Sequence, residues 1–174
     1  MNGVILVGDG LYDALGALLE EDYKVQVVDA ATDSAAIAEV VAGMKQQMIE
    51  GVAVIAIGPS ATLVLETPSL MAELAAAVLF AANPPASPIP YDQLRLQLLF
   101  HRAESGTAMS AEQLETLKQG ANADNVLVFS WAYKTANDRF LVAPAGDESD
   151  LATIAWDRTR DFLINALPEE PLPS

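Results

Sequence analysis

The sequence predicts an α/β domain of three layers, in which helices cover both faces of a mainly parallel sheet and a C-terminal antiparallel hairpin lies at one edge. Three observations carry this prediction. Short apolar runs, typical of strands buried on both faces, alternate with segments whose apolar residues recur every three or four positions. The β-α-β-α-β order of the first 60 residues favours right-handed crossovers and parallel strands. The length of 174 residues suits one hydrophobic core.

The first half of the chain supplies three expected strands and two helices. We expect the strands at Val4–Val7, Lys24–Val28 and Val52–Ile57. A helix between the first two is indicated by apolar residues spaced three or four apart, namely Leu11, Ala14, Leu15, Leu18 and Leu19. The second helix carries its apolar stripe from Ile37 to Met48, and Thr32-Asp33-Ser34 offers its N-cap.

The segment from Ser69 to Ala82 has Glu73 as its single charged residue and is interpreted as a helix. Because it is apolar nearly all round, it is either buried within the chain or covered in part by another subunit. Aromatic side chains on a later strand form a second candidate contact patch. The candidate interface residues are therefore Leu70, Leu74, Val78, Trp131 and Tyr133.

The remaining elements follow a proline-rich connection at 83–90. Ser110 and Gln113 have the spacing of a capping box, which begins a helix that reaches Gly120. The other expected elements are strands at 93–100 and 126–133, a returning antiparallel strand at 139–142 and a helix at 151–167. We therefore expect a single domain over 1–167 and a flexible tail over 168–174.

Composition excludes several classes of protein. Apolar residues make up 52% of the chain, which argues against disorder, and the absence of Cys argues against disulfide, zinc-ribbon and iron–sulfur scaffolds. The net charge of −15 repels phosphate, so we expect no nucleic-acid partner. Neither a signal peptide nor an uninterrupted apolar stretch long enough to span a membrane is apparent, so the expected compartment is the cytoplasm.

Ligands of open parallel sheets bind beyond the carboxyl ends of the strands. This rule selects the candidate ligand-binding residues Gly8, Asp9, Gly10, Asp29, Asp33, Gly58 and Ser60. We expect no cofactor. The alternative is Mg²⁺ held by Asp9 and Asp29, with Asp33 close by, because carboxylate oxygens suit hard cations. The plainer interpretation is that Asp9 makes a turn and Asp33 caps a helix.

The opening segment resembles two families. Gly8 and Gly10 match the first two glycines of the Rossmann Gly-x-Gly-x-x-Gly pattern, and Asp29 stands where an acid would bind the ribose. The third glycine position holds Asp13, which would repel a phosphate. The stretch 18–28 resembles receiver domains of response regulators, which implies a flavodoxin-like sheet. Since no acid follows the third strand, the chain is at most a pseudo-receiver.

A third resemblance is to SGNH hydrolases, which also have a flavodoxin-like sheet. Their Gly-Asp-Ser block corresponds to Gly8-Asp9-Gly10, where glycine replaces the nucleophile. Gly58-Pro59-Ser60-Ala61 lacks the family's oxyanion asparagine, and Asp147–Asp150 has Asp in place of the late histidine. His101 is the only histidine, and we expect it to be structural. Serine hydrolysis needs a hydroxyl, a base and anion donors together, and the first two are missing here.

These degraded motifs predict a non-catalytic binding, regulatory or assembly module that acts through contacts with a protein partner or a second copy. One alternative is a divergent, SGNH-like hydrolase or a nucleotide-binding enzyme that uses the Gly8-Asp9-Gly10 loop. Another is a structural component of a larger assembly, in which exposed strand edges would be used.

Overall fold

A computed structural model describes residues 1–29 and 33–168 and contains one six-stranded sheet with the order β2-β1-β3-β4-β5-β6. Every neighbouring pair of strands is parallel, so all six carboxyl ends lie at one edge of the sheet. The strands are β1 Gly3–Val7, β2 Lys24–Val28, β3 Val52–Ile57, β4 Ala76–Phe80, β5 Gln97–Ala103 and β6 Val128–Tyr133.

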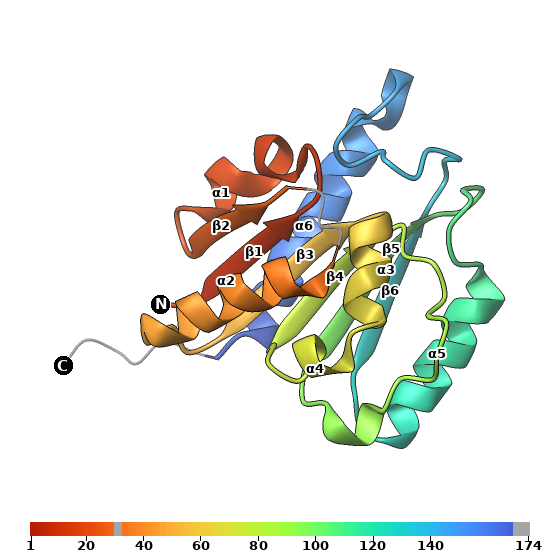
Figure 1. The fold of residues 1–174 in the computed structure, drawn as a ribbon. Helices are drawn as coiled ribbons and strands as arrows, with labels where there is room; N and C mark the ends of the chain where they lie inside the picture. Colours follow the sequence, from red (N-terminus) through yellow and green to blue (C-terminus); the bar gives the residue numbers. More distant parts are fainter. Residues whose placement is uncertain (30–32, 169–174) are drawn as a thin grey trace.

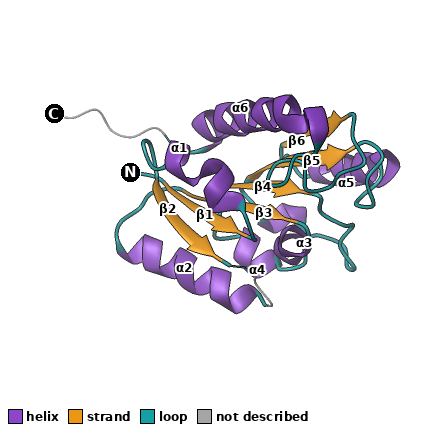
Figure 2. Cartoon of the chain, turned by 90° about the horizontal axis from the view of Figure 1, so that it is seen from above, coloured by secondary structure: helices purple, strands orange, loops and turns teal. Residues whose placement is uncertain are grey.

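Helices cover both faces of this sheet (Figures 1 and 2). One face is packed by α2 Ser34–Gln46, α3 Pro59–Leu65, α4 Pro68–Met71 and α5 Ala111–Ala123. The other face is packed by α6 Ser149–Ala166 and by a π-helical turn, Tyr12–Gly16, that continues into α1 Ala17–Leu19. Short 3₁₀ turns occupy Tyr91–Gln93 and Gly146–Glu148. The α/β class and its parallel, three-layer sheet are thus as the sequence predicts.

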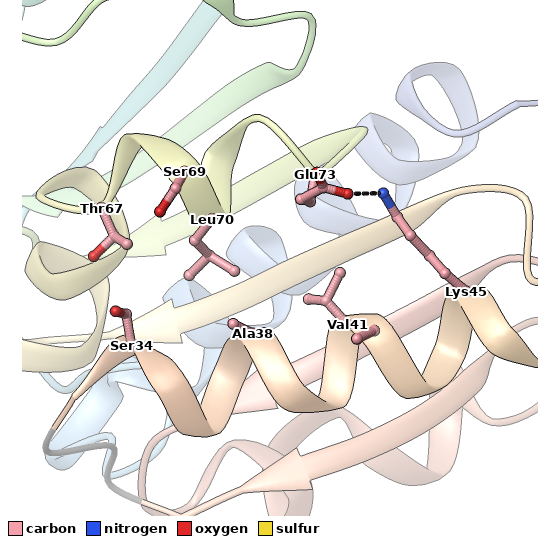
Figure 3. Close-up of a pocket in the computed structure, with 9 residues that line it drawn as sticks. Ser34, Ala38, Val41, Lys45, Thr67, Ser69, Leu70 and Glu73 are labelled. Atoms are coloured by element: carbon pink, nitrogen blue, oxygen red, sulfur yellow. Dashed lines mark hydrogen bonds and ion pairs between the residues drawn. The ribbon is translucent and has the colours of Figure 1, made fainter.

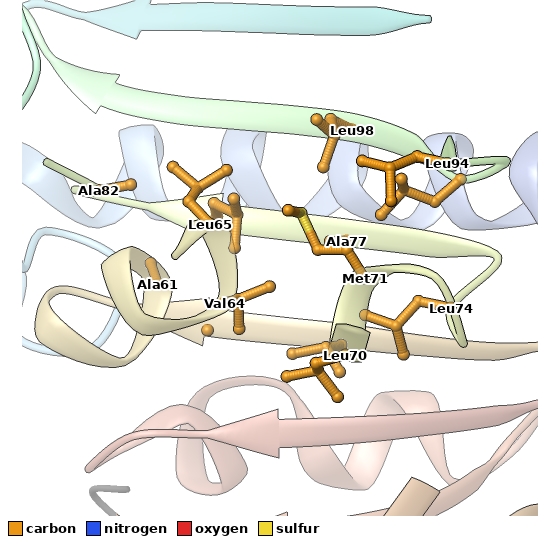
Figure 4. Packing of buried hydrophobic residues seen from close by; sticks show 14 of the residues in the cluster. Ala61, Val64, Leu65, Leu70, Met71, Leu74, Ala77, Ala82, Leu94 and Leu98 are labelled. Atoms are coloured by element: carbon orange, nitrogen blue, oxygen red, sulfur yellow. The ribbon is translucent and has the colours of Figure 1, made fainter. Parts of the chain in front are cut away.

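The two cores explain the apolar strands. All residues of β1, β3 and β4 are buried, because each of these strands has helices on both sides. Figure 4 shows the cluster in which Leu65 of α3, and Leu70 and Met71 of α4, pack over Ala77 of β4 and Leu98 of β5. These short helices are held by this packing more than by their own length.

The C-terminal hairpin of the sequence-based prediction is wrong. β6 runs parallel to β5, and residues 139–142 form turns. Phe140 is buried because its ring packs against Phe80 and Tyr133 as the loop crosses the sheet edge. The apolar residues that predict a strand there are side chains that a loop inserts into the core.

The expected helix over 69–82 is also wrong, because α4 ends at Met71 and Ala76–Phe80 is strand β4. A run buried on all sides has no polar face, so periodicity does not separate a helix from a central strand. Leu70, Leu74 and Val78 are at most 4% exposed and belong to the chain's own core, so they are not available to a partner. Tyr133 is buried as well, whereas Trp131 is 44% exposed.

Local signals are confirmed where a side chain caps a helix. Asp33 accepts a hydrogen bond from the backbone N–H of Ala35 at the start of α2, and Ser110 and Gln113 form the expected capping box of α5. The segment after β3, expected to be a loop, begins α3 at Pro59.

No helix in the described part of the chain is both long and apolar enough to cross a membrane. Most of the expected tail lies outside the described residues.

Candidate active site

The sheet turns sharply into α3 at Gly58. This residue has φ 63° and ψ −130°, in the left-handed region that side chains with a Cβ rarely adopt. Its N–H donates to the Phe80 oxygen at 2.8 Å, and its oxygen accepts from the N–H of Thr62 at 3.1 Å. A Cβ placed on Gly58 would have no atom within 4 Å, so open space lies above this elbow.

The loop after β1 lies beside the elbow. Val7 pairs with Ala56, and a Cβ on Gly8 would lie 2.6 Å from the Cγ2 atom of Ile57. The loop that contains Asp9 therefore begins beside the end of β3, at the carboxyl edge of the sheet.

The loop after β6 crosses the same edge and reaches the Asp9 loop. Arg139 donates from Nη2 to the main-chain oxygen of Asp9 at 3.1 Å, although the two residues are 130 positions apart. Val142 packs on Gly10, where an added Cβ would lie 3.1 Å from the Val142 Cβ. The loop after β6 thus contacts the loop after β1, which itself begins beside the end of β3.

A second contact ties the β6 loop to the loop after β5. Asp138 accepts hydrogen bonds at Oδ2 from the N–H of Thr107 at 2.9 Å and from its hydroxyl at 2.7 Å. Its Oδ1 is buried without a hydrogen-bond partner among the described residues. A Cβ on Gly106 would lie 2.0 Å from that oxygen, so position 106 has no room for a side chain.

Two exposed charged side chains lie on the loops that meet at this edge. Asp9 is exposed, and within the described chain no basic side chain lies within 4.0 Å of its carboxylate. Arg139 is also exposed, and its bond to Asp9 uses one of the five N–H groups of the guanidinium. An exposed carboxylate and an exposed cation with hydrogen-bonding capacity left over therefore lie on the loops after β1 and β6 at this edge of the sheet.

The predicted site residues are brought together only in part. Gly8, Gly10 and Asp29 line a hollow of about 300 Å³ together with Tyr12, Asp13 and Val27. Asp33 is used as the cap of α2, and Ser60 is only 4% exposed in the first turn of α3. Among the described residues, no group of three or more His, Asp or Glu side chains could hold a metal ion. The hollow is acidic, which disfavours a phosphate-bearing ligand.

Another hollow, of about 430 Å³, lies between α2 and α4 away from the elbow (Figure 3). Ala38, Val41 and Leu70 form its apolar wall, and Lys45 pairs with Glu73 at 2.5 Å at one end. The Lys45 ammonium lowers the pKa of Glu73 through this hydrogen bond. Since the two charges satisfy each other, the described lining of this hollow holds no unpaired charge, and its other polar groups are the hydroxyls of Ser34, Thr67 and Ser69.

His101 is not a base for this site. It is 1% exposed, its Nδ1 lies 2.8 Å from the Tyr133 hydroxyl, and its Nε2 lies 2.9 Å from the Thr159 hydroxyl. Burial, with a smaller effect of the Arg158 charge, lowers its pKa to about 3. The ring is therefore neutral and fully bonded inside the protein, in line with the structural role expected from the sequence.

Comparison with known proteins identifies the architecture. No family model matches the chain, and no curated protein matches it. Among solved structures, it is similar to an α/β hydrolase enzyme from a Medee basin deep-sea metagenome library, with a TM-score of 0.73 at 13% identity over 95% of this chain and 84% of that one. It is also similar to a Pyrococcus furiosus esterase, with a TM-score of 0.70 at 14% identity over 96% and 83% of the two chains.

A third neighbour is a dienelactone hydrolase-like promiscuous phosphotriesterase from metagenomic libraries, with a TM-score of 0.66 at 12% identity over 97% of this chain and 87% of that one. The chain has an α/β-hydrolase-like fold. The resemblance to flavodoxin-like receiver domains is therefore wrong. The prediction of a non-catalytic module is wrong on the same comparison, because these neighbours are hydrolases and esterases. The alternative of a divergent hydrolase fits better.

The elbow of this chain departs from serine hydrolases of the α/β-hydrolase fold. There the nucleophile occupies the strained strand-to-helix turn, and the next residue gives a backbone N–H to the oxyanion. Here the turn residue Gly58 has no side chain, and Pro59 has no N–H. An acid and then a histidine follow in chain order in that fold. The only histidine, His101, is buried within β5. An acyl-enzyme on Gly58 is therefore impossible.

Sequence reasoning missed the elbow and the two residues of the β6 loop. The families that the sequence resembles have an acid or an asparagine after the third strand, and a glycine at that place gives no motif. Arg139 and Asp138 lay in a segment interpreted as a hairpin, so their position over the carboxyl edge was not apparent. A strand that runs directly into Gly-Pro at the start of a helix was the signal that could have indicated the turn.

Proposed function

We propose that the chain is a divergent hydrolase that cleaves a carboxylic ester by direct attack of water at the Gly58 elbow. The observation that carries the proposal is the open space above Gly58, at the same edge of the sheet at which Arg139 bonds to the Asp9 loop. A water molecule there would stand where a nucleophilic side chain is missing. The esterases among the structural neighbours support ester hydrolysis as the reaction class.

In the proposed step, the water oxygen attacks the ester carbonyl carbon while the Asp9 carboxylate takes a proton from that water. The electron pair of the C=O bond moves to the carbonyl oxygen, which receives an N–H bond from Arg139. When the tetrahedral intermediate collapses, the bond to the alcohol oxygen breaks, and that oxygen recovers the proton from Asp9. The products are a carboxylic acid and an alcohol, and no covalent enzyme intermediate forms.

Hydrolysis of 4-nitrophenyl acetate and butyrate by the whole chain tests this function. We expect Asp9→Asn to lower kcat by roughly a hundredfold or more, because a general base contributes about 10²–10⁴ in rate. Asp13→Asn is the matched control, since Asp13 is an exposed acid of the neighbouring hollow with no part in the step. Equal rates for wild type and Asp9→Asn, or no hydrolysis above the buffer rate, would overturn the proposal.

Labelling with a fluorophosphonate, which reacts with activated serines, tests the direct attack of water separately. The expected result is a chain of unchanged mass after incubation, because Ser60 is buried and Gly58 has no hydroxyl. Modification of any serine, coupled to loss of esterase activity, would replace the water mechanism by a covalent one.

A further inference from the structure

The free edge of β6 carries an inference separate from the elbow. β6 is the last strand of the sheet in the described part of the chain and pairs only with β5. The oxygens of Leu127 and Tyr133 accept from Leu98 and Glu104 on the β5 side, at 3.0 and 2.8 Å. Backbone groups alternate in direction along a parallel ladder, so those of Val128, Ser130 and Ala132 face outward.

These outward groups form a pattern that is symmetric about Ser130. Apart from the sheet ladder, no backbone hydrogen bond of the described residues reaches Val128, Ser130 or Ala132. In an antiparallel ladder, every second pair of opposite residues exchanges both of its backbone hydrogen bonds. A two-fold axis through Ser130 would pair it with its own copy, and Val128 with Ala132 of the other chain. The outward N–H and C=O groups of all three residues would then each have a hydrogen-bond partner in the other chain.

Side chains beside the edge fit the same arrangement. Phe129 and Trp131 are 46% and 44% exposed and belong to the α6 face of the sheet, where Phe129 packs on Phe162. In the register centred on Ser130, Phe129 of one chain lies opposite Trp131 of the other. Cross-strand aromatic pairs of this kind stabilise antiparallel sheets. The pairing would cover two large apolar side chains that the single chain leaves half exposed.

Charge does not oppose contact at the strand itself. Val128–Tyr133 has no charged residue and no proline, the devices with which natural edge strands avoid pairing. Arg158 and Asp161 line a hollow of about 310 Å³ beside Trp131, so each copy would bring one cation and one anion to the axis. The Arg158 guanidinium lies 3.6 Å above the Trp131 ring, which fixes that ring at the edge.

We propose that two copies of the chain associate through antiparallel pairing of their β6 strands about Ser130, which joins two sheets into one continuous sheet. The paired strand explains together the symmetric set of outward backbone groups, the exposed aromatic pair and the absence of charge on the strand. The occupant of this edge is a second copy because the hydrogen-bonding pattern, the aromatic pair and the Arg158–Asp161 pair are each complementary to themselves.

Sedimentation of the whole chain over a wide range of concentrations gives the first test. We expect a species of twice 18.4 kDa that dissociates on dilution. Ser130→Pro should shift the mass to 18.4 kDa, because the proline removes an outward N–H and leaves the β5 ladder intact. Ser130→Ala, which keeps that N–H, should remain dimeric. A wild type that stays monomeric throughout, or a Ser130→Pro variant that is folded and dimeric, would overturn the proposal.

Single cysteines test the register, since the chain has none of its own. In the proposed dimer, the two copies of residue 130 have Cα atoms about 5.5 Å apart. The two copies of residue 132 are about 14 Å apart, because four residues of strand separate them. A short bis-maleimide should therefore link Ser130→Cys chains and leave Ala132→Cys chains unlinked. Linkage of Ala132→Cys alone, or equal linkage of both, would contradict pairing about Ser130.

Discussion

Gly106 and Asp138 are in such close contact that a Cβ atom on Gly106 would lie 2.0 Å from Oδ1 of Asp138. We predict that Gly106→Ala lowers the free energy of unfolding by about 1–3 kcal/mol, because either the Asp138 carboxylate or the loop must move. Asp138 would then lose hydrogen bonds from Thr107 that tie the β5 and β6 loops together. Chemical denaturation followed by circular dichroism measures the change.

Gly43→Ala provides the control for that experiment. A Cβ on Gly43 meets no atom within 4 Å, and the residue lies inside α2, where alanine is favoured over glycine. This variant should be as stable as the wild type or slightly more stable. If Gly106→Ala unfolds at the same denaturant concentration as Gly43→Ala, the loop accommodates the added methyl group with no loss of stability.

A different physical cause operates at the elbow, where space is open and only the backbone is strained. Gly58→Ala should cost about 1–3 kcal/mol of stability, because φ 63° with ψ −130° is a conformation that side chains with a Cβ rarely adopt. The added methyl group meets no atom within 4 Å, so no clash contributes. Crystallography of the variant should show the same elbow. An unchanged midpoint of denaturation would mean that the turn has relaxed to another backbone conformation.

The parts of the fold that could be predicted from the sequence are those in which one local pattern has one meaning. β1 and β3 are apolar runs that end at a glycine, β2 is a valine-rich run that ends at an acid, and α5 begins at a capping box. β4 could not be predicted, because Ala76–Phe80 is buried on both faces and has no polar residue to reveal a period of two. The turn after β3 is therefore the feature that distinguishes this fold.

The candidate site is harder to predict from the sequence than the fold, because it depends on a backbone angle and on a contact between distant positions. Motifs report side chains, and the elbow is defined by a backbone angle at Gly58. Arg139 reaches Asp9 across 130 positions, a contact that follows only from the path of the loop after β6. The loop residues Gly8, Asp9 and Gly10 were found, because the carboxyl edge of a parallel sheet can be located from the strands alone.

The hydrogen bonds of His101 give a prediction about the core. The Thr159 hydroxyl donates to the Ala155 oxygen at 2.8 Å, so it accepts from Nε2–H of His101, and Nδ1 accepts from the Tyr133 hydroxyl. Tyr133→Phe leaves Nδ1 buried without a donor, which should cost about 1–3 kcal/mol. Denaturant titration measures the loss, and Tyr91→Phe is the control because the Tyr91 hydroxyl makes no hydrogen bond within the described part of the chain. Equal stability of the two variants would contradict the bonding described here.

The same histidine makes stability depend on pH in a defined direction. His101 has a pKa of about 3 in the folded protein, lowered from 6.5 chiefly by burial. The unfolded chain therefore binds one more proton between these values, and the stabilisation, complete above pH 6.5, is lost as the pH falls towards 3. In this range the wild type should lose up to about 1.4 kcal/mol more per pH unit than His101→Gln, which does not titrate. Carboxylates such as Glu73 titrate in both proteins and cancel in the difference between the two curves. Parallel curves of unfolding free energy against pH would show that the ring gains its proton without unfolding.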